Sequence, residues 1–308
     1  MDPTETTRDR MENDAVMVEA KPTRLSGREV GVWALGTIYV GIQVAQVLTK
    51  DAIPSSAFNG IITISSFSAA LVHGSIRYGW RGIGLFALLT ILIGNVLENI
   101  SIVSGFPFGW YHYSEALGPQ FVRVPLVIGP AYFSVGYLAW AVANAILGDG
   151  DRSVRGLDWL MLPIIAAFVM LGWDVAMDPL RSTAAGYWVW TNGGGYFGVP
   201  LSNFLGWYLT VFLANACFGW FLRVCPQSVV PDQRSAYWHQ AAILFMACAL
   251  PFLLAYMSGS AAVVTDARGV SWQVRDMQES AVLISLFTMI FAGFTAIFCV
   301  RARGVKVR

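Results

Sequence analysis

Eight long apolar runs dominate this chain and limit what it can fold into. They lie near residues 31–49, 57–76, 82–103, 124–148, 157–178, 201–223, 239–258 and 280–300. A helix needs about 20 mostly apolar residues to cross the hydrocarbon core of a membrane, and each run has about that length. Because lipid offers no partners for backbone polar groups, such runs form helices. The sequence therefore predicts an all-α integral membrane protein with about eight transmembrane helices.

The composition agrees with a membrane location and argues against several other classes. Of the 308 residues, 56% are hydrophobic and only 13% are charged, whereas a soluble domain carries about 25% charged residues. The net charge of +1 is spread over many loops, so no basic patch for nucleic acid is expected. The four cysteines show no paired spacing, which argues against a disulfide framework and against a cysteine metal site.

Two polar tails flank the apolar part of the chain. Residues 1–28 are charged and carry no signal peptide, and we expect them to be disordered and cytosolic. Residues 29–300 are expected to form a single transmembrane helical domain, and residues 301–308 a basic cytosolic tail.

The charges of the loops predict the orientation. With a cytoplasmic N-terminus, 15 of the 20 Lys and Arg residues fall in inner segments, and the outer loops hold only Lys50, Arg123, Arg181, Arg268 and Arg275. Positive charge concentrates on the cytoplasmic side of membrane proteins. We therefore predict a multi-pass protein of the cell membrane with both termini in the cytoplasm.

The four central spans contain an internal repeat. In each unit an acidic residue near the outer end of one span precedes an aromatic loop, and a Val-Pro pair precedes the next span. The matching features are Glu98 and Asp174, loops 109–113 and 186–190, Val124-Pro125 and Val199-Pro200, and Tyr132 and Trp207. Both units run in the same direction, so the repeat is parallel and implies a pseudo-two-fold axis along the membrane normal. We expect Glu98 and Asp174 at similar depth on facing helices.

Ionisable residues inside membrane spans are costly and commonly functional. The candidate catalytic residues are Glu98, Asp174 and Asp178 within spans, Asn203 in the sixth span, and His112 in the first aromatic loop. The candidate substrate-binding residues are Trp110, Tyr111, Tyr113, Tyr132, Trp173, Trp188, Trp190 and Trp207. No metal site is predicted among them.

Simpler explanations exist for both groups. A carboxylate at the outer end of a helix can be solvated or can cap the following loop, and Asp178 directly before Pro179 fits that explanation well. Trp and Tyr also form belts at the boundary between lipid and water. Such a belt accounts for Trp110, Trp188 and Trp190 as well as a binding site does, and both explanations stay open at this point.

An acid among aromatic rings suits one kind of reaction. A carboxylic acid kept away from water retains its proton and can act as a general acid. Each aromatic face stabilises a nearby cation by about 0.5–2 kcal/mol. Protonation of an alkene to a tertiary carbocation requires both features, and a membrane location predicts a lipid-soluble substrate such as a polyprenoid or carotenoid.

The same residues carry a resemblance to a known family. They are Glu98-Asn99, Gly105-Phe106-Pro107-Phe108-Gly109, Tyr111-His112-Tyr113, Val124-Pro125, Asp174, Asp178-Pro179, Trp188-Val189-Trp190, residues 195–200 and residues 203–207. Over residues 30–300, and most strongly over 94–207, the chain resembles the membrane carotenoid-biosynthesis family that includes the CruF-type carotenoid 1,2-hydratases. The resemblance implies cofactor-independent addition of water to the terminal C1=C2 bond of an acyclic carotenoid, which gives a tertiary 1-hydroxy group.

The residues allow a mechanism to be written for such a reaction. Asp174 or Glu98 protonates C2, and aromatic rings of the two loops, Trp110, Tyr111, Trp188 and Trp190, enclose the cation at C1. The other carboxylate, with Asn203 or His112, orients the attacking water and accepts its proton. Which carboxylate is the acid stays open.

Three rival functions share these features. A terpene or carotene cyclase would protonate the same alkene and trap the cation with an internal double bond. A membrane prenyltransferase of the UbiA type is suggested by Asp174 and Asp178, but the spans offer no second aspartate-rich motif for Mg²⁺. A transporter or lipid-binding protein without chemistry would also have repeated halves, although its site is expected at the midplane.

Overall fold

The computed structural model describes residues 25–49, 55–148, 151, 157–230 and 233–306. Its helices are α2 (Gly27–Thr49), α3 (Ser55–Ser104), α4 (Ile128–Leu147), α5 (Met161–Pro179), α6 (Leu201–Val224), α7 (Ser235–Ala247), α8 (Leu250–Ser258), α9 (Val274–Ile284) and α10 (Phe291–Lys306). Three two-stranded ribbons pair β1 (Tyr111–Tyr113) with β4 (Trp188–Trp190), β2 (Gln120–Phe121) with β3 (Val124–Pro125), and β5 (Val263–Thr265) with β6 (Ser271–Gln273). Short turns are η2 (Glu115–Leu117), η3 (Asp158–Leu160), η4 (Leu180–Ala184), η5 (Pro226–Ser228) and η6 (Ser285–Ile290). The predicted all-α membrane fold is confirmed.

The long helix α3 accounts for two of the predicted spans. Its 50 residues would extend about 75 Å if straight, well beyond the roughly 30 Å of hydrocarbon. At Gly79 the backbone has φ 63° and ψ 171°, a conformation restricted to glycine. The two halves fold back on each other, because Gly74 lies against the side chain of Ile83, while Asn59 and Glu98 line one cavity. With this hairpin, the seven apolar helical stretches of the described residues make eight crossings.

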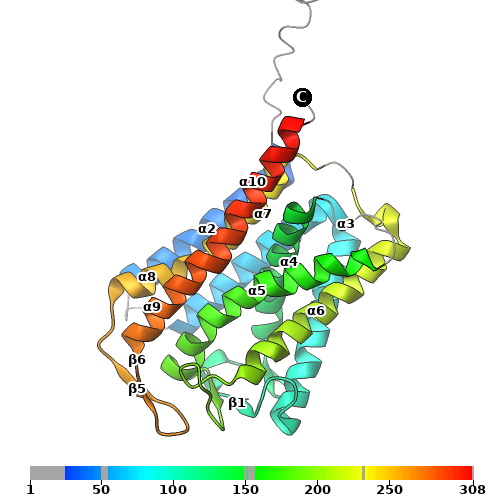
Figure 1. Cartoon of the computed structure of the whole chain (residues 1–308). Coiled ribbons are helices and arrows are strands. Elements are labelled where there is room, and N and C mark those ends of the chain that lie inside the picture. The colour runs from blue at the N-terminus through cyan, green and yellow to red at the C-terminus, as the bar shows by residue number, and fades with distance from the viewer. Residues whose placement is uncertain (1–24, 50–54, 149–150, 152–156, 231–232, 307–308) are drawn as a thin grey trace, which may run out of the picture.

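Figure 1 shows that the bundle has two distinct ends. The start of α2 and the end of α10 lie together at what we call the terminal end, whereas β1, β5 and β6 lie at the opposite end, the loop end. The hairpin turn of α3 belongs to the terminal end, since Arg28 on α2 donates to the carbonyl of Ser75 at 3.0 Å. An even number of crossings follows. Which end faces the cytoplasm stays a prediction.

Several element boundaries differ from the sequence-based ones. Val124-Pro125 form strand β3, so α4 begins at Ile128. The seventh span is broken into α7 and α8 close to Pro251, which lacks a backbone donor. Residues 1–24 of the predicted tail lie outside the described residues, and α10 extends through Lys306 into the predicted C-terminal tail.

The internal repeat is a two-fold arrangement in space. β1 and β4 pair antiparallel, with Tyr111 opposite Trp190, His112 opposite Val189 and Tyr113 opposite Trp188. His112 and Val189 are counterparts in the repeat, and a residue faces its own counterpart where a two-fold axis passes between the two. Deeper in the bundle, the counterparts Tyr132 and Trp207 stack with ring centroids 4.0 Å apart and planes 11° apart. The two halves therefore meet along one axis, as the parallel repeat predicts.

Helix α4 lies at the centre of the bundle. It is apolar on all sides, and its buried residues extend without interruption from Tyr132 to Ala145. A helix that is hydrophobic all round is expected in the interior. The large rings of Tyr132, Tyr137 and Trp140 are fully buried there, so α4 is the scaffold on which the other central helices pack.

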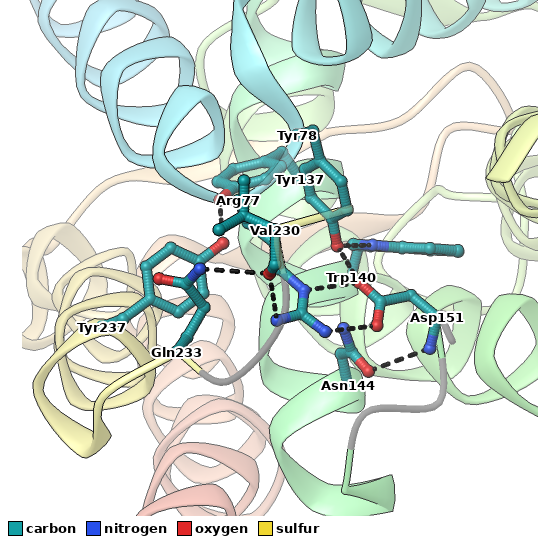
Figure 2. Close-up of polar contacts among 9 residues, drawn as sticks. All are labelled: Arg77, Tyr78, Tyr137, Trp140, Asn144, Asp151, Val230, Gln233 and Tyr237. Carbon is teal, nitrogen blue, oxygen red and sulfur yellow. Dashed lines mark hydrogen bonds and ion pairs between the residues drawn. The ribbon is translucent and has the colours of Figure 1, made fainter. Parts of the chain in front are cut away.

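A buried polar cluster closes the terminal end (Figure 2). Arg77 donates from Nε and Nη2 to the two carboxylate oxygens of Asp151 at 2.7 and 2.6 Å, and both side chains are fully buried. The Tyr78 hydroxyl donates to the same carboxylate at 2.6 Å and accepts from the Trp140 indole at 2.9 Å. The backbone amide of Asp151 donates to the side-chain oxygen of Asn144 at 3.2 Å. The cluster therefore fixes the turn of α3 to the C-terminal end of α4.

Candidate active site

A cavity of about 180 Å³ lies at the loop end, among the central helices. Its polar lining includes Asn59, Thr63, Ser66, Glu98, Ser134, Arg181 and Asn203, and its aromatic lining comprises Tyr39, Phe108, Tyr111, Tyr113, Tyr132, Trp173, Tyr187, Trp188, Trp190, Trp207 and Phe252. On α4 the lining runs from Ile128 to Leu138, which is about 15 Å along a helix. The cavity therefore extends from the loops into the bundle.

The ribbon of β1 and β4 forms the floor of this cavity. Successive side chains of a strand point to opposite faces, so Tyr111 and Tyr113 share one face of β1, while Trp188 and Trp190 share one face of β4. These four aromatic side chains line the cavity. His112 lies between the two tyrosines and is exposed, and it does not line the cavity. The structure therefore places these four aromatic side chains at the cavity and leaves His112 outside it.

Glu98 is the carboxylic acid that lines the cavity. It is 2% exposed, and its Oε2 accepts a hydrogen bond from the Tyr113 hydroxyl at 2.5 Å. The hydroxyls of Tyr111 and Tyr132 lie close to the same carboxyl group, and the Tyr132 hydroxyl has no hydrogen-bond partner among the described residues. Burial raises the pKa of Tyr111 and Tyr113 on β1 well above its usual range, so both remain protonated donors at neutral pH.

Asp178 is held behind the cavity wall by the repeat's second loop. Its Oδ1 accepts from the indoles of Trp188 and Trp190 at 3.1 and 3.3 Å. Its Oδ2 accepts from Asn203 Nδ2 at 2.5 Å. These bonds fix the orientation of both tryptophan rings, so Asp178 positions the aromatic wall without lining the cavity.

Asp174 lies next to this group and is fully buried. Its Oδ2 accepts from Asn203 Nδ2 at 3.3 Å, while its Oδ1 has no hydrogen-bond partner among the described residues. Asn203 lines the cavity, but Asp174 does not. The two acids of the repeat, Glu98 and Asp174, therefore occupy different surroundings: one faces the cavity among tyrosines, and the other is behind an asparagine.

The aromatic candidates divide in the same way. Trp173 lines the cavity and meets Trp207 edge-on at 6.0 Å between ring centroids. Trp207 in turn stacks on Tyr132. Trp110 is 46% exposed and packs over Gly105, away from the cavity lining. Its place fits the interfacial belt better than the cation-binding role proposed from the sequence.

Among the polar cavity residues that sequence reasoning missed, three interact with one another. Asn59 Nδ2 donates to the Tyr187 hydroxyl at 2.9 Å, and Arg181 Nη1 donates to Asn59 Oδ1 at 3.4 Å. The Arg181 guanidinium lies 5.7 Å from the centre of the Tyr187 ring. Arg181 sits on η4, a π-helical turn directly after Pro179, and such turns are frequent at functional sites. The sequence signal that could have identified Arg181 was its charge, which lies just before the second aromatic loop.

The fixed arrangement around Asp178 makes a testable prediction. Asp178→Asn replaces one acceptor oxygen with a donor, so an indole or the Asn203 amide loses its partner. We expect a loss of about 1–3 kcal/mol in the free energy of unfolding, because a buried donor is left unsatisfied. Thermal unfolding in detergent, followed by near-ultraviolet circular dichroism of the tryptophans, measures it. Asp276→Asn on the exposed face of α9 is the matched control, and equal melting temperatures for the two variants would contradict the assignment.

Within the described residues, no group of three or more His, Cys, Asp or Glu side chains is arranged to hold a metal ion. Comparison with known proteins then decides the family. Residues 58–274 match the family described as "Carotenoid biosynthesis protein". The chain belongs to this family. The match covers more than half of the chain and includes the cavity-lining residues from Asn59 to Phe252.

One relative with a named activity is similar to this chain over most of its length. The bisanhydrobacterioruberin hydratase of Haloarcula japonica is 29% identical over 209 residues, which is 64% of this chain and 68% of the relative. No solved structure matches the chain significantly. The resemblance inferred from the residues is therefore confirmed at the level of the family.

Proposed function

We propose that this protein hydrates the terminal C1=C2 bond of an acyclic carotenoid to a tertiary 1-hydroxy group. The observation that carries the proposal is Glu98, a buried carboxylic acid that faces an aromatic cavity inside a membrane bundle. The similarity to a hydratase named for a carotenoid substrate supports the same reaction. Addition of water is neutral in redox terms, so the proposed scheme uses no cofactor.

The cavity suits the end of a polyene rather than its whole length. An apolar protein cavity of about 150 Å³ accommodates benzene, so the cavity of about 180 Å³ accommodates a five-carbon isoprene end group with little room left. The rest of the polyene would lie outside this cavity, along lipid-facing surfaces of the bundle.

Glu98 performs the first step in this scheme. Its Oε2 accepts the Tyr113 hydroxyl, which leaves Oε1 to carry the transferable proton. That proton moves to C2, the electron pair of the C1=C2 bond forms the new C2–H bond, and a tertiary cation remains at C1. The hydrogen bond from Tyr113 then stabilises the glutamate anion that forms, because hydrogen bonds to charged groups are strong.

The aromatic wall stabilises the cation. Trp188 and Trp190 are held rigidly by Asp178, and Tyr111 packs against Trp190 with ring centroids 4.9 Å apart. A cation near such ring faces gains about 0.5–2 kcal/mol from each. Because the rings are fixed before the reaction, their orientation costs nothing at the moment when the charge develops.

Water completes the reaction in the second step. Asn203 lines the cavity and contacts both aspartates, so it is placed to orient a water against C1. The water oxygen bonds to C1, and the proton that it loses passes to the Glu98 carboxylate, which lines the same cavity and is thereby reprotonated for the next turnover. Asn203 is better placed for this role than the exposed His112.

Product mass tests the proposal. We expect membranes that contain the protein to convert an acyclic carotene into a product heavier by one water for each modified end. A product of unchanged mass with altered absorption would identify cyclisation instead. Unmodified substrate in membranes with folded protein, under conditions in which a known hydratase works, would contradict enzymatic chemistry and favour a binding or transport role.

A further inference from the structure

A second cavity, of about 520 Å³, lies beside the first at the loop end. It is formed by α2, α8, the start of α9 and the π-helical turn η4. Three of its lining residues, Arg181, Pro251 and Phe252, also line the proposed active site. These three residues are therefore the wall that separates the two cavities.

The second cavity has a more polar lining than the first, which is mainly aromatic. Its lining includes Gln43, Gln46, Ser258 and Gln278. Gln43 and Gln278 are only 2% and 7% exposed, yet the Oε1 atom of each has no hydrogen-bond partner among the described residues. The amide nitrogen of Gln43 is used, because it donates to the carbonyl of Tyr39 at 3.3 Å.

Two unpaired amide oxygens in a roomy cavity indicate water. Buried polar groups are satisfied by protein or by ordered water, and a cavity holds water when it is large enough and has polar partners, whereas apolar cavities stay dry. The second cavity meets both conditions. With the isoprene end group bound, the active-site cavity of about 180 Å³ has little room left for water, so its nucleophile has to be supplied from elsewhere.

The polar half of the wall between the cavities is held by one long contact. Arg181 Nη1 reaches Asn59 Oδ1 at 3.4 Å, near the long limit of a hydrogen bond, so a small rotation of the side chain opens that contact. Phe252 on α8 is the apolar half of the wall. Water that crosses beside Arg181 enters the active site between Asn59 and Tyr187.

We propose that the second cavity is a water vestibule that supplies the nucleophile for the cation at C1. The inference rests on the proposed function, and it explains why water captures the cation. With the vestibule filled, water captures the cation by forming the C1–O bond and giving up a proton. Without it, the cation loses a proton and returns to an alkene, or an internal double bond traps it.

The test separates protonation from water capture. Membranes are incubated with an acyclic carotene in D₂O, and both the tertiary alcohol and deuterium at C2 of the recovered alkene are measured by mass spectrometry. Gln43→Leu/Gln278→Leu makes the vestibule apolar at similar side-chain volume. Ala184→Phe obstructs it from η4. Gln273→Leu, on the exposed strand β6, is the matched control.

We expect alcohol formation to fall by about tenfold or more in the vestibule variants, while deuterium continues to enter the recovered alkene. The Gln273→Leu control should keep the wild-type ratio. If the double variant does not fold, Ala184→Phe decides alone. Wild-type alcohol formation in a folded vestibule variant would overturn the inference, and so would loss of alcohol and deuterium together. A wild-type protein that forms no alcohol would overturn the proposed function and the inference with it.

Discussion

Glu98→Gln is expected to abolish hydration and to leave the fold intact. Glutamine has nearly the same shape and still accepts the Tyr113 hydrogen bond through its amide oxygen, but it has no transferable proton. A positioned general acid contributes about 10²–10⁴-fold to a rate, so we expect hydroxylated product to fall by that factor. The variant is expressed in a host that accumulates an acyclic carotene. Chromatography and mass spectrometry of the carotenoid extract then measure the amount of hydroxylated product.

The control for this variant is Glu115→Gln. Glu115 lies in η2, in the loop that follows α3, and it is exposed and does not line the cavity. The hydration rate of this variant should therefore match that of the wild type. Equal protein in the membrane fraction and equal melting temperatures establish that both variants fold. Normal hydroxylated product from folded Glu98→Gln would remove Glu98 from the role of acid, and Asp174→Asn would then test the alternative.

Arg77→Met is expected to cost about 3–5 kcal/mol of unfolding free energy, because it leaves the Asp151 carboxylate buried without its cation. Arg77 and Asp151 are both fully buried in the terminal-end cluster, and Tyr78 alone cannot compensate for the charge (Figure 2). Thermal denaturation in detergent, followed by gel filtration, measures the loss. Activity per folded molecule should be retained, since the cluster lies at the end of the bundle opposite the active site.

A partly exposed ion pair provides the comparison. Arg268 pairs with Asp266 at 2.9 Å, and the two side chains are 38% and 3% exposed. Because the Asp266 carboxylate also accepts from two backbone amides and the Trp272 indole, Arg268→Met should change stability by less than about 1 kcal/mol. Replacing both buried partners, in Arg77→Met/Asp151→Leu, should recover much of the stability because no uncompensated charge remains. A single Arg77→Met variant as stable as Arg268→Met would show that the cluster is not required for the fold.

The repeat brings two aromatic pairs together, and each pair contacts a different acid. Tyr111 and Tyr113 of the first unit correspond to Trp188 and Trp190 of the second, and the β1–β4 ribbon brings all four together. A tyrosine hydroxyl next to Glu98 leaves that acid facing the cavity. The indoles of the second unit instead point back to Asp178. Divergence of the aromatic pair therefore separates an acid that can react from an acid that positions the wall.

The sequence by itself determined the class of fold and the neighbourhood of the site. Apolar runs of about 20 residues specify spans, because every backbone polar group in lipid needs an internal partner. The matching offsets of Glu98 and Asp174, and of the two aromatic loops, specified a repeat whose halves meet. Both signals are spacings of residues along the chain, and a single sequence shows such spacings directly.

The tertiary structure decided which residues face the cavity. The alternation of β1 turns His112 outward and Tyr113 inward, and that alternation depends on the pairing with β4, which is 77 residues away in the repeat. Asn59 and Arg181 come together only because α3 folds back at Gly79. The second cavity combines α2 with α8 and α9. Contacts between distant segments depend on how the helices pack and on the direction in which each side chain points. Residue spacing along the chain does not specify either of these.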